Sequence, residues 1–242
     1  MPDVEVRPLE LARVELPDSH PEAPGVDTIH GFIVRDERSC VLVDTGVGAD
    51  SDLINGLYNP VCADLPAVLR EAGVSLSEVT AVVNSHLHFD HCGNNPLFPG
   101  VPILVQEAEL RASLAAGYTV PEWVRFAGAN YEPISGRRAL SPCIELMPTP
   151  GHTPGHQSVV VRSGEQVEVV VAQASYTAAE FQFFGRTAHD PVPEVAAGAQ
   201  GFLRSNATWS EEAYLSSLAG LHRLRPDKAY FSHDPFVWTR AA

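Results

Sequence analysis

The sequence predicts an α/β protein, a four-layer αββα sandwich in which two mixed β-sheets are flanked by helices. Strand-like segments occur in two groups along the chain, and each group comes with a helix. In both groups, polar side chains that can bind metal ions directly follow a strand. This order indicates one site along an edge between the sheets. We expect a single domain over residues 1–242, because 45% hydrophobic content allows a large core and no low-complexity linker divides the chain.

The first group of strands opens the chain. Residues 4–16 alternate loosely between apolar and polar side chains, and Thr28–Val34 with Cys40–Val43 predicts a strand pair joined by a short polar turn. The β-branched run Val79–Val83 predicts a buried strand, and residues 101–105 predict a further short one.

Two helices are expected beside these strands. Asp64 can cap the first, which has Pro66 in its first turn, apolar residues at helical spacing and a stop at Gly73. Ser75–Glu78 has the form of a capping box, but strand-like residues follow it, so we expect only a single turn there. The second helix is expected at residues 107–115.

The second half repeats the order of strands and helix. Cys143–Met147 predicts a strand, and His156–Arg162 with Gln166–Ala172 predicts a hairpin whose arms are rich in valine. Ser210 can cap a helix with acidic residues in its first turn and arginines in its last, the charge order that the helix dipole favours. Lys228–Ser232 then predicts the last strand.

Two aromatic segments show no clear periodicity. We expect residues 117–136 and 177–206 to be irregular, and long irregular segments in such places are often functional. Ordinary packing under a loop is the alternative. We expect them to line an apolar pocket for a substrate through Trp123, Phe126, Phe181, Phe183 and Phe184.

The run that follows the Val79–Val83 strand carries the strongest chemical signal. It contains His86, His88, Asp90 and His91, which are three imidazoles and a carboxylate within six residues. One histidine in a polar loop would most often contact only water. Four such groups at the C-terminal end of a strand indicate a site for zinc or a similar cation, because these ions favour imidazole and carboxylate ligands.

Four motifs in order resemble those of the metallo-β-lactamase fold superfamily. They are the His-x-His-x-Asp-His run at 86–91, the Asp-Thr-Gly turn at 44–46, the Gly-His loop at 148–156 and the strand with histidine at 230–234. The resemblance spans about 190 residues, from Val41 to His233, and implies the same αββα architecture. It further implies that His86, His88 and His152 hold one metal ion, and that Asp90, His91 and His233 hold a second.

The resemblance also implies the chemistry. Zinc is expected, as one or two divalent ions, with iron, manganese or cobalt as alternatives. Water bound to such ions ionises near neutral pH, which supplies a hydroxide nucleophile without a serine or cysteine. Asp44 either caps a turn or orients the metal loop, and these roles are compatible.

Within the superfamily, the N-acyl homoserine lactone hydrolases are the most similar subgroup. Their metal motif matches residues 86–91, and Ala174-Ser175-Tyr176 matches the triplet whose tyrosine contacts the lactone. Asp90 and Tyr176 are therefore the candidate catalytic residues, with Tyr176 as a hydrogen-bond donor to developing negative charge. Without the resemblance, a structural role for a buried Tyr176 would be favoured.

One position departs from that subgroup. Where its members carry an aspartate that bridges the two metals, this chain has Gln173. A neutral amide cannot supply the charge of a carboxylate, and two divalent ions about 3.5–4 Å apart repel each other strongly. The site is expected to hold one metal, to hold a second more weakly, or to act on a different substrate.

Composition excludes several partners. Acidic residues outnumber basic ones 30 to 16, which gives a formal charge of −14, and a field of this sign repels nucleic acid. The N-terminus lacks the features of an export signal and no 18-residue apolar run occurs, so we expect a cytoplasmic protein that does not enter membranes. The oligomeric state is not indicated.

Four cysteines without a Cys-x-x-Cys pair indicate reduced thiols rather than a disulfide framework. Cys92 directly follows His91 and could be a soft metal ligand or a reactive thiol. Packing beneath the metal loop is the favoured interpretation.

Together these features predict a metal-dependent hydrolase that uses hydroxide to open a lactone or cleave a carboxylic ester, with N-acyl homoserine lactone-like compounds as candidate substrates. A thioesterase of the glyoxalase II type is the main alternative. Because of Gln173, a catalytically weak metal-binding or ligand-sensing protein is another. Lactam hydrolysis is disfavoured, because a secreted antibiotic-degrading enzyme would need an export signal.

Overall fold

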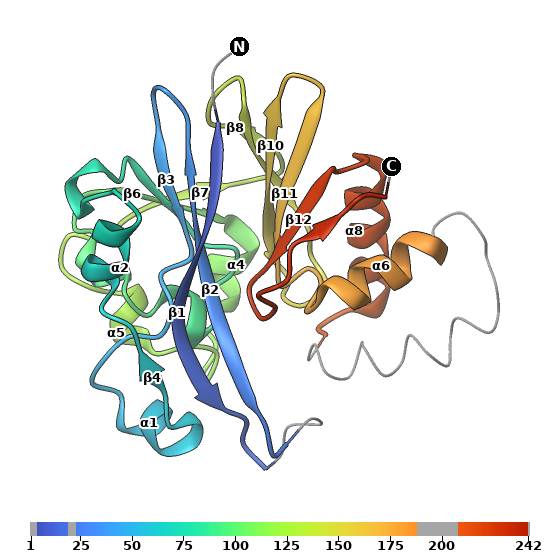
Figure 1. Ribbon diagram of the computed structural model, residues 1–242. Coiled ribbons are helices and arrows are strands. Elements are labelled where there is room, and N and C mark those ends of the chain that lie inside the picture. Colours follow the sequence, from blue (N-terminus) through green and yellow to red (C-terminus); the bar gives the residue numbers. More distant parts are fainter. Residues whose placement is uncertain (1–3, 19–22, 188–207, 242) are drawn as a thin grey trace.

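Two mixed β-sheets pack face to face between layers of helices (Figure 1). The computed structural model describes residues 4–18, 23–187 and 208–241. In Figure 1 one sheet and its helices, among them α2 and α5, occupy the left half of the molecule, and the other sheet with α6 and α8 occupies the right half. The predicted four-layer αββα sandwich is confirmed.

The first sheet has seven strands in the order β4-β1-β2-β3-β5-β6-β7. The neighbouring strands β4, β1, β2 and β3 pair in antiparallel fashion. The strands β3, β5, β6 and β7 run parallel to one another. The bounds are β1 Glu5–Glu15, β2 Val26–Arg35, β3 Cys40–Val43, β4 Val61–Cys62, β5 Ala81–Val83, β6 Pro102–Gln106 and β7 Asn130–Ile134.

The second sheet has six strands in the order β13-β12-β11-β10-β9-β8. Only β11 and β12 are parallel neighbours, and the hairpin of β10 and β11 is antiparallel as expected. The bounds are β8 Arg138–Ala139, β9 Ile144–Pro148, β10 Gln157–Ser163, β11 Gln166–Ala172, β12 Lys228–Phe231 and β13 Trp238–Thr239.

Two predicted N-cap residues precede helices, with a side-chain cap bond at Ser210 but not at Asp64, and the helix expected at residues 107–115 ends at Ala112. Ser210 Oγ accepts the backbone N–H of Ala213 at the start of α8, and Asp64 is the N-cap residue of α2. The bounds are α1 Asp52–Tyr58, α2 Leu65–Glu71, α3 Phe89–Cys92, α4 Glu107–Ala112, α5 Pro121–Val124, α6 Ala178–Thr187 and α8 Glu211–Arg223. Short 3₁₀ turns lie at Leu76–Glu78, where a single turn was expected, and at Asn95–Leu97.

Three apolar clusters separate the four layers. Valines and other side chains of both sheets, such as Val43 and Val159, form the central cluster. Leu65 and Leu69 of α2 cover the outer face of the first sheet, and Tyr214 and Leu218 of α8 cover the outer face of the second. Burial of these side chains holds the sheets so that the carboxyl ends of β5, β9 and β12 can bring their loops together.

The expectation of an irregular segment from residue 177 is wrong for its first part. Residues 178–187 form α6, because Thr177 Oγ1 accepts the backbone N–H of Glu180 and apolar side chains follow at helical spacing. Phe181 and Phe184 belong to the core against the second sheet, and the partly buried Phe183 packs against that core. The part of this segment at 188–206 lies outside the described residues.

The other aromatic segment is also more regular than expected, since it contains α5 and β7. Trp123 is buried in a cluster with Val47 and Ile54. Trp123 and Phe126 do line a hollow of about 610 Å³ that Gly93 also borders. That this hollow takes part of a substrate stays a prediction.

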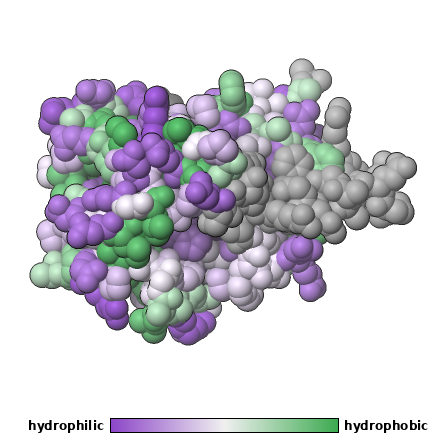
Figure 2. All heavy atoms as spheres, turned by 90° about the horizontal axis from the view of Figure 1, so that it is seen from below, coloured by the Kyte–Doolittle hydropathy of each residue, from purple (hydrophilic) through white to green (hydrophobic). Residues whose placement is uncertain are grey.

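Hydrophilic and hydrophobic residues are mixed on one face of the molecule. Figure 2 shows the side that faces down in Figure 1, with hydrophilic residues across much of it and hydrophobic residues in separate patches. No helix among the residues described here is long and apolar enough to span a bilayer.

Candidate metal centre

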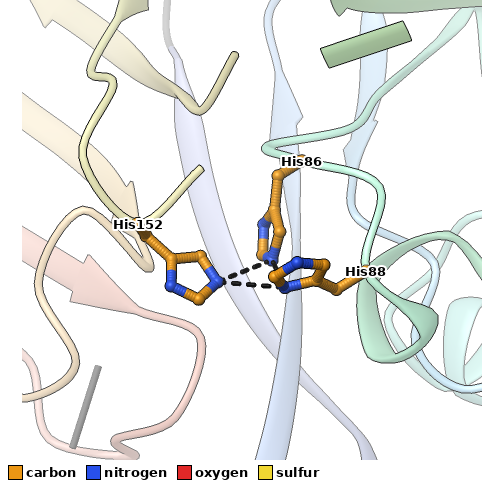
Figure 3. Close-up of side chains that lie close together, drawn as sticks. All are labelled: His86, His88 and His152. Carbon is orange, nitrogen blue, oxygen red and sulfur yellow. Dashed lines mark hydrogen bonds between the residues drawn. The ribbon is translucent and has the colours of Figure 1, made fainter. Parts of the chain in front are cut away.

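Three histidine rings converge from two loops (Figure 3). His86 and His88 lie in the loop after β5, and His152 lies in the loop between β9 and β10. His152 Nε2 is 3.2 Å from His86 Nε2 and 3.1 Å from His88 Nδ1, and the last two atoms are 3.1 Å apart. Three nitrogens around a tetrahedral zinc would be about 3.3–3.4 Å apart, since Zn–N bonds are about 2.0–2.1 Å long. The triangle therefore fits a metal ion.

The tautomer of His86 follows from its neighbour. Ser85 Oγ donates its one hydrogen to Asp44 Oδ2 at 2.7 Å, so at 3.1 Å from His86 Nδ1 it can only accept. The proton of a neutral His86 then sits on Nδ1, and the lone pair of Nε2 points into the triangle. Burial, together with nearby histidines, lowers the pKa of His86 well below its ordinary value, and burial lowers that of His88 to about 4. Both rings are neutral near pH 7, as metal ligands must be.

A second group lies beside the first. It combines Asp90 and His91, from α3, with His233, which follows β12, and one ligand-type atom of each lies within 4.8 Å of the others. Asp90 Oδ2 is 3.4 Å from His91 Nε2 and 3.7 Å from His233 Nε2. His86 and His91 connect the groups, with ring centroids 4.0 Å apart.

Several ring nitrogens of this second group are buried without a hydrogen-bond partner. They are Nε2 of His91 and both nitrogens of His233. Unpaired buried polar atoms are costly, and a bound cation would satisfy one nitrogen of each ring. The donor atoms of both groups therefore fit metal ions.

Asp44 links the two groups. It stands at the end of β3 in a left-handed conformation with φ +60°, and its carboxylate is fully buried. The carboxylate accepts the backbone N–H and the hydroxyl of Ser85, both at 2.7 Å, and Nδ1–H of His91 at 2.8 Å. Burial alone would lower the pKa of His91, but Asp90 and Asp44 outweigh it and raise the pKa to about 10. A metal ion that binds at Nε2 therefore competes with a proton that these two carboxylates favour.

Glu109 of α4 joins the loops that carry the first group, and no sequence motif pointed to it. Its buried carboxylate accepts the backbone N–H of Leu87 at 2.9 Å and the hydroxyl of Thr153 at 2.7 Å. It also accepts the N–H of Gly155 at 3.1 Å and the hydroxyl of Tyr118. The sequence offered no signal, because these partners are brought together only by the fold.

Tyr176 lies against the second group. Its ring stacks on His233 with centroids 4.6 Å apart and planes 9° apart, and its hydroxyl donates to Asp27. Glu180 holds the backbone N–H of Tyr176 and also accepts from the hydroxyls of Ser175 and Tyr214. The tyrosine side chain therefore lies at the candidate site, and its hydroxyl hydrogen bonds to the Asp27 carboxylate.

Gln173 lies at the same sheet edge. It follows Ala172, whose carbonyl accepts the N–H of Ser232 at 3.3 Å, so its backbone is next to the His233 loop. The backbone N–H of Gln173 donates to His156 Nε2 at 3.2 Å, and His156 Nδ1 donates to Thr149 Oγ1 at 2.9 Å. His156 thus holds the chain at Gln173, a role that the sequence did not reveal.

Cys92 packs beneath the loop. Its thiol is buried and lies 3.3 Å from the carbonyl oxygen of His88, and burial raises its pKa to about 12. It belongs to neither of the described groups that could hold a metal. Its surroundings favour packing over reactivity.

The fold and the paired groups define a candidate metalloprotein with a site between two sheets. The family model of the Metallo-beta-lactamase superfamily matches residues 24–233, and the chain belongs to this superfamily. Among solved structures, a mutant of the AiiA protein of Bacillus thuringiensis with N-decanoyl-L-homoserine bound at its active site is similar, with a TM-score of 0.74 and 26% identity. That similarity covers 95% of this chain and 93% of the other.

Curated relatives are similar over a shorter part. The N-acyl homoserine lactonase AiiA of Bacillus thuringiensis subsp. kurstaki is 32% identical over 164 residues, which span 62% of this chain and 65% of the relative. A probable metallo-hydrolase of Mycobacterium tuberculosis is 29% identical over 177 residues, 61% of this chain and 56% of the relative. A dizinc quorum-quenching lactonase, AidC, shares the fold with a TM-score of 0.70 at 19% identity.

Proposed function

We propose that this protein is a metal-dependent hydrolase that opens a lactone or cleaves a carboxylic ester, with N-acyl homoserine lactones as the substrate class. The observation that carries the proposal is the pair of adjacent ligand groups, three imidazoles in one and Asp90, His91 and His233 in the other. The similarity to N-acyl homoserine lactonases supports the choice of substrate.

In this proposal His86, His88 and His152 hold one divalent ion, and Asp90, His91 and His233 hold the other. Zinc suits the donor set, and iron, manganese or cobalt would suit it too. Such ions, when bound, lower the pKa of water and polarise a carbonyl group. Asp44 keeps the ring nitrogens of His86 and His91 directed at the site, and Asp90 supplies the one carboxylate of the two groups.

Tyr176 is proposed to donate a hydrogen bond to the oxygen on which negative charge develops. In the structure its hydroxyl donates to Asp27. A substrate oxygen must therefore compete with this carboxylate for the hydrogen, or the hydroxyl must turn away from Asp27.

An apolar acyl chain has a candidate contact surface at α1 and α3. The rings of Tyr58 and Phe89 pack at a centroid distance of 4.4 Å, and both are only partly buried. Phe89 directly precedes Asp90, and the charge of Asp90 contributes, after burial, to a raised pKa of Tyr58. The pair therefore adjoins the second group.

The proposal is tested by a hydrolysis panel on zinc-loaded protein, with acyl homoserine lactones, aryl esters and thioesters of matched acyl length. Lactones are expected to give the highest kcat/KM. Preference for thioesters would favour the glyoxalase II type of activity. Metal binding without turnover of any of the three classes would favour a sensing role and contradict the hydrolase.

The acyl surface has a separate test. Each buried methylene contributes about 0.8 kcal/mol, so kcat/KM is expected to rise about fourfold per added carbon over the first several carbons. Phe89→Ala should flatten the series. Leu53→Ala, which removes an exposed side chain of α1, is the control. A series that stays flat in the natural protein would indicate a small polar substrate.

A further inference from the structure

Asp27 is a buried carboxylate at the second ligand group, and no motif in the sequence marks it. It lies near the start of β2 in the first sheet, and only 9% of its surface is exposed. Its Oδ2 atom accepts the hydroxyl hydrogen of Tyr176 and is 3.0 Å from His233 Nδ1. One acid of the first sheet thus contacts two site residues of the second sheet.

The position of Asp27 relative to His233 is fixed by a neighbouring contact. The backbone N–H of His30, also on β2, donates to the carbonyl oxygen of Ser232 at 2.8 Å. His30 Nδ1 lies 3.2 Å from the same oxygen and must carry its proton there, because a carbonyl only accepts. Two bonds therefore attach β2 to the residue before His233.

The two histidines of the second group have similar surroundings. His91 has a carboxylate, Asp44, 2.8 Å from Nδ1, and His233 has Asp27 3.0 Å from Nδ1. In each ring Nε2 is the nitrogen nearer to Asp90. The contact between Asp44 and His91 is a hydrogen bond with good geometry. Asp27 lies at ion-pair distance from His233, but the angle at the ring nitrogen does not suit a hydrogen bond. Carboxylates behind the ligating histidines raise their basicity and strengthen metal binding.

Charge explains why a second such carboxylate is needed. Two divalent ions bring four positive charges, and the first group offers only neutral imidazoles. Asp90 is the one carboxylate among the six candidate ligands, and Gln173 adds no charge at the adjoining strand end. Besides Asp90, the buried acids that contact these histidines in the described part of the chain are Asp44 and Asp27.

We propose that Asp27 is a positioning residue for His233, which supplies negative charge to the second metal position and compensates for the neutral Gln173. The inference rests on the proposed metal binding. It gives strand β2 a role in the site, although none of the motifs at the strand ends lies on β2.

The test is a zinc titration of the metal-free, full-length protein by calorimetry with a competing chelator. The natural protein is expected to bind two equivalents, and His233→Ala identifies the step that belongs to the second group. Asp27→Asn keeps the shape and removes the charge. It should weaken that step by about 10- to 100-fold and leave the first step unchanged, which also shows that the variant is folded.

Two further variants separate charge from structure. Asp27→Asn combined with Gln173→Asp returns a carboxylate to the site and should recover most of the lost affinity. Asp18→Asn removes one exposed charge from the segment between β1 and β2 and should bind as the natural protein does. Two unchanged steps in Asp27→Asn would overturn the inference alone, whereas no zinc uptake by the natural protein would overturn the proposed function as well.

Discussion

At the scale of single residues, Asp44 has the widest influence on the site, because its carboxylate contacts both groups. It fixes the His86 tautomer through Ser85 and holds His91 directly. In Asp44→Asn an amide NH₂ replaces one of the accepting oxygens, so these orientations are lost. Zinc affinity is expected to fall about 10- to 100-fold at the second group and also to fall at the first.

The control for that variant is Asp50→Asn. Asp50 has a φ of +62°, close to that of Asp44, but it is exposed. Chelator competition on both variants separates the loss of the buried contacts from the cost of asparagine in a left-handed conformation. Natural affinity in Asp44→Asn would show that the rings are held by other groups.

A second prediction at this scale concerns Gln173. A neutral side chain at the end of β11 leaves the second position with less negative charge than a bridging carboxylate would give. The natural protein should therefore show two affinity classes for zinc, and Gln173→Asp should tighten the weaker class only. Two equally tight equivalents, unaltered in Gln173→Asp, would contradict this electrostatic argument.

The residues that the sequence revealed and those it did not differ in one respect. His86, His88, Asp90 and His91 are neighbours along the chain, so their spacing alone indicated a shared site. Asp27 contacts Tyr176, which is 149 residues away in the sequence, and Glu109 contacts Gly155, which is 46 residues away. A lone acid in a strand or a helix looks the same in the sequence whether it is solvated or buried, so only the fold could reveal these two.

At the scale of elements, capping signals explain both a success and a failure. Ser210 was expected to cap α8 and does so, since its Oγ accepts from Ala213. The sequence Thr177-Ala178-Ala179-Glu180 has the Thr-x-x-Glu form of a capping box, but the aromatic residues after it show no clear periodicity and predict an irregular segment. The moderate amphipathic pattern of α6 was a weaker signal than its cap.

The Ser210 cap is also attached to the site. The backbone N–H of Ser210 donates to the carbonyl of Gly151, and that of Trp209 donates to the carbonyl of His152. Ser210→Ala is expected to cost about 1 kcal/mol in the free energy of unfolding, measured by urea denaturation. Ser216→Ala, an exposed serine within α8, should cost nothing. Equal effects of the two changes would show that the cap contributes no stability.

At the scale of the whole molecule, the αββα arrangement was predictable because strand and helix patterns repeat in both halves. The short edge strands β4, β8 and β13 were not predicted, since two-residue pairings leave no periodic pattern. The order of strands within each sheet could not be predicted from local patterns either, because it depends on how distant segments of the chain pair and pack. The candidate ligands then come from both sheets, His86, His88, Asp90 and His91 from one and His152 and His233 from the other.

A metal ion bound by ligands of both sheets would tie them together. Binding to the folded state alone, at an ion concentration about 100 times Kd, adds about 2.7 kcal/mol to the free energy of unfolding. For a chain of this size that corresponds to a change of roughly 5–10 °C in Tm. Dialysis against a chelator should lower Tm by this amount and abolish hydrolysis, and added zinc should restore both. A metal-free protein with unchanged Tm and full activity would show that the two groups are structural histidine clusters and that hydrolysis does not depend on a metal ion.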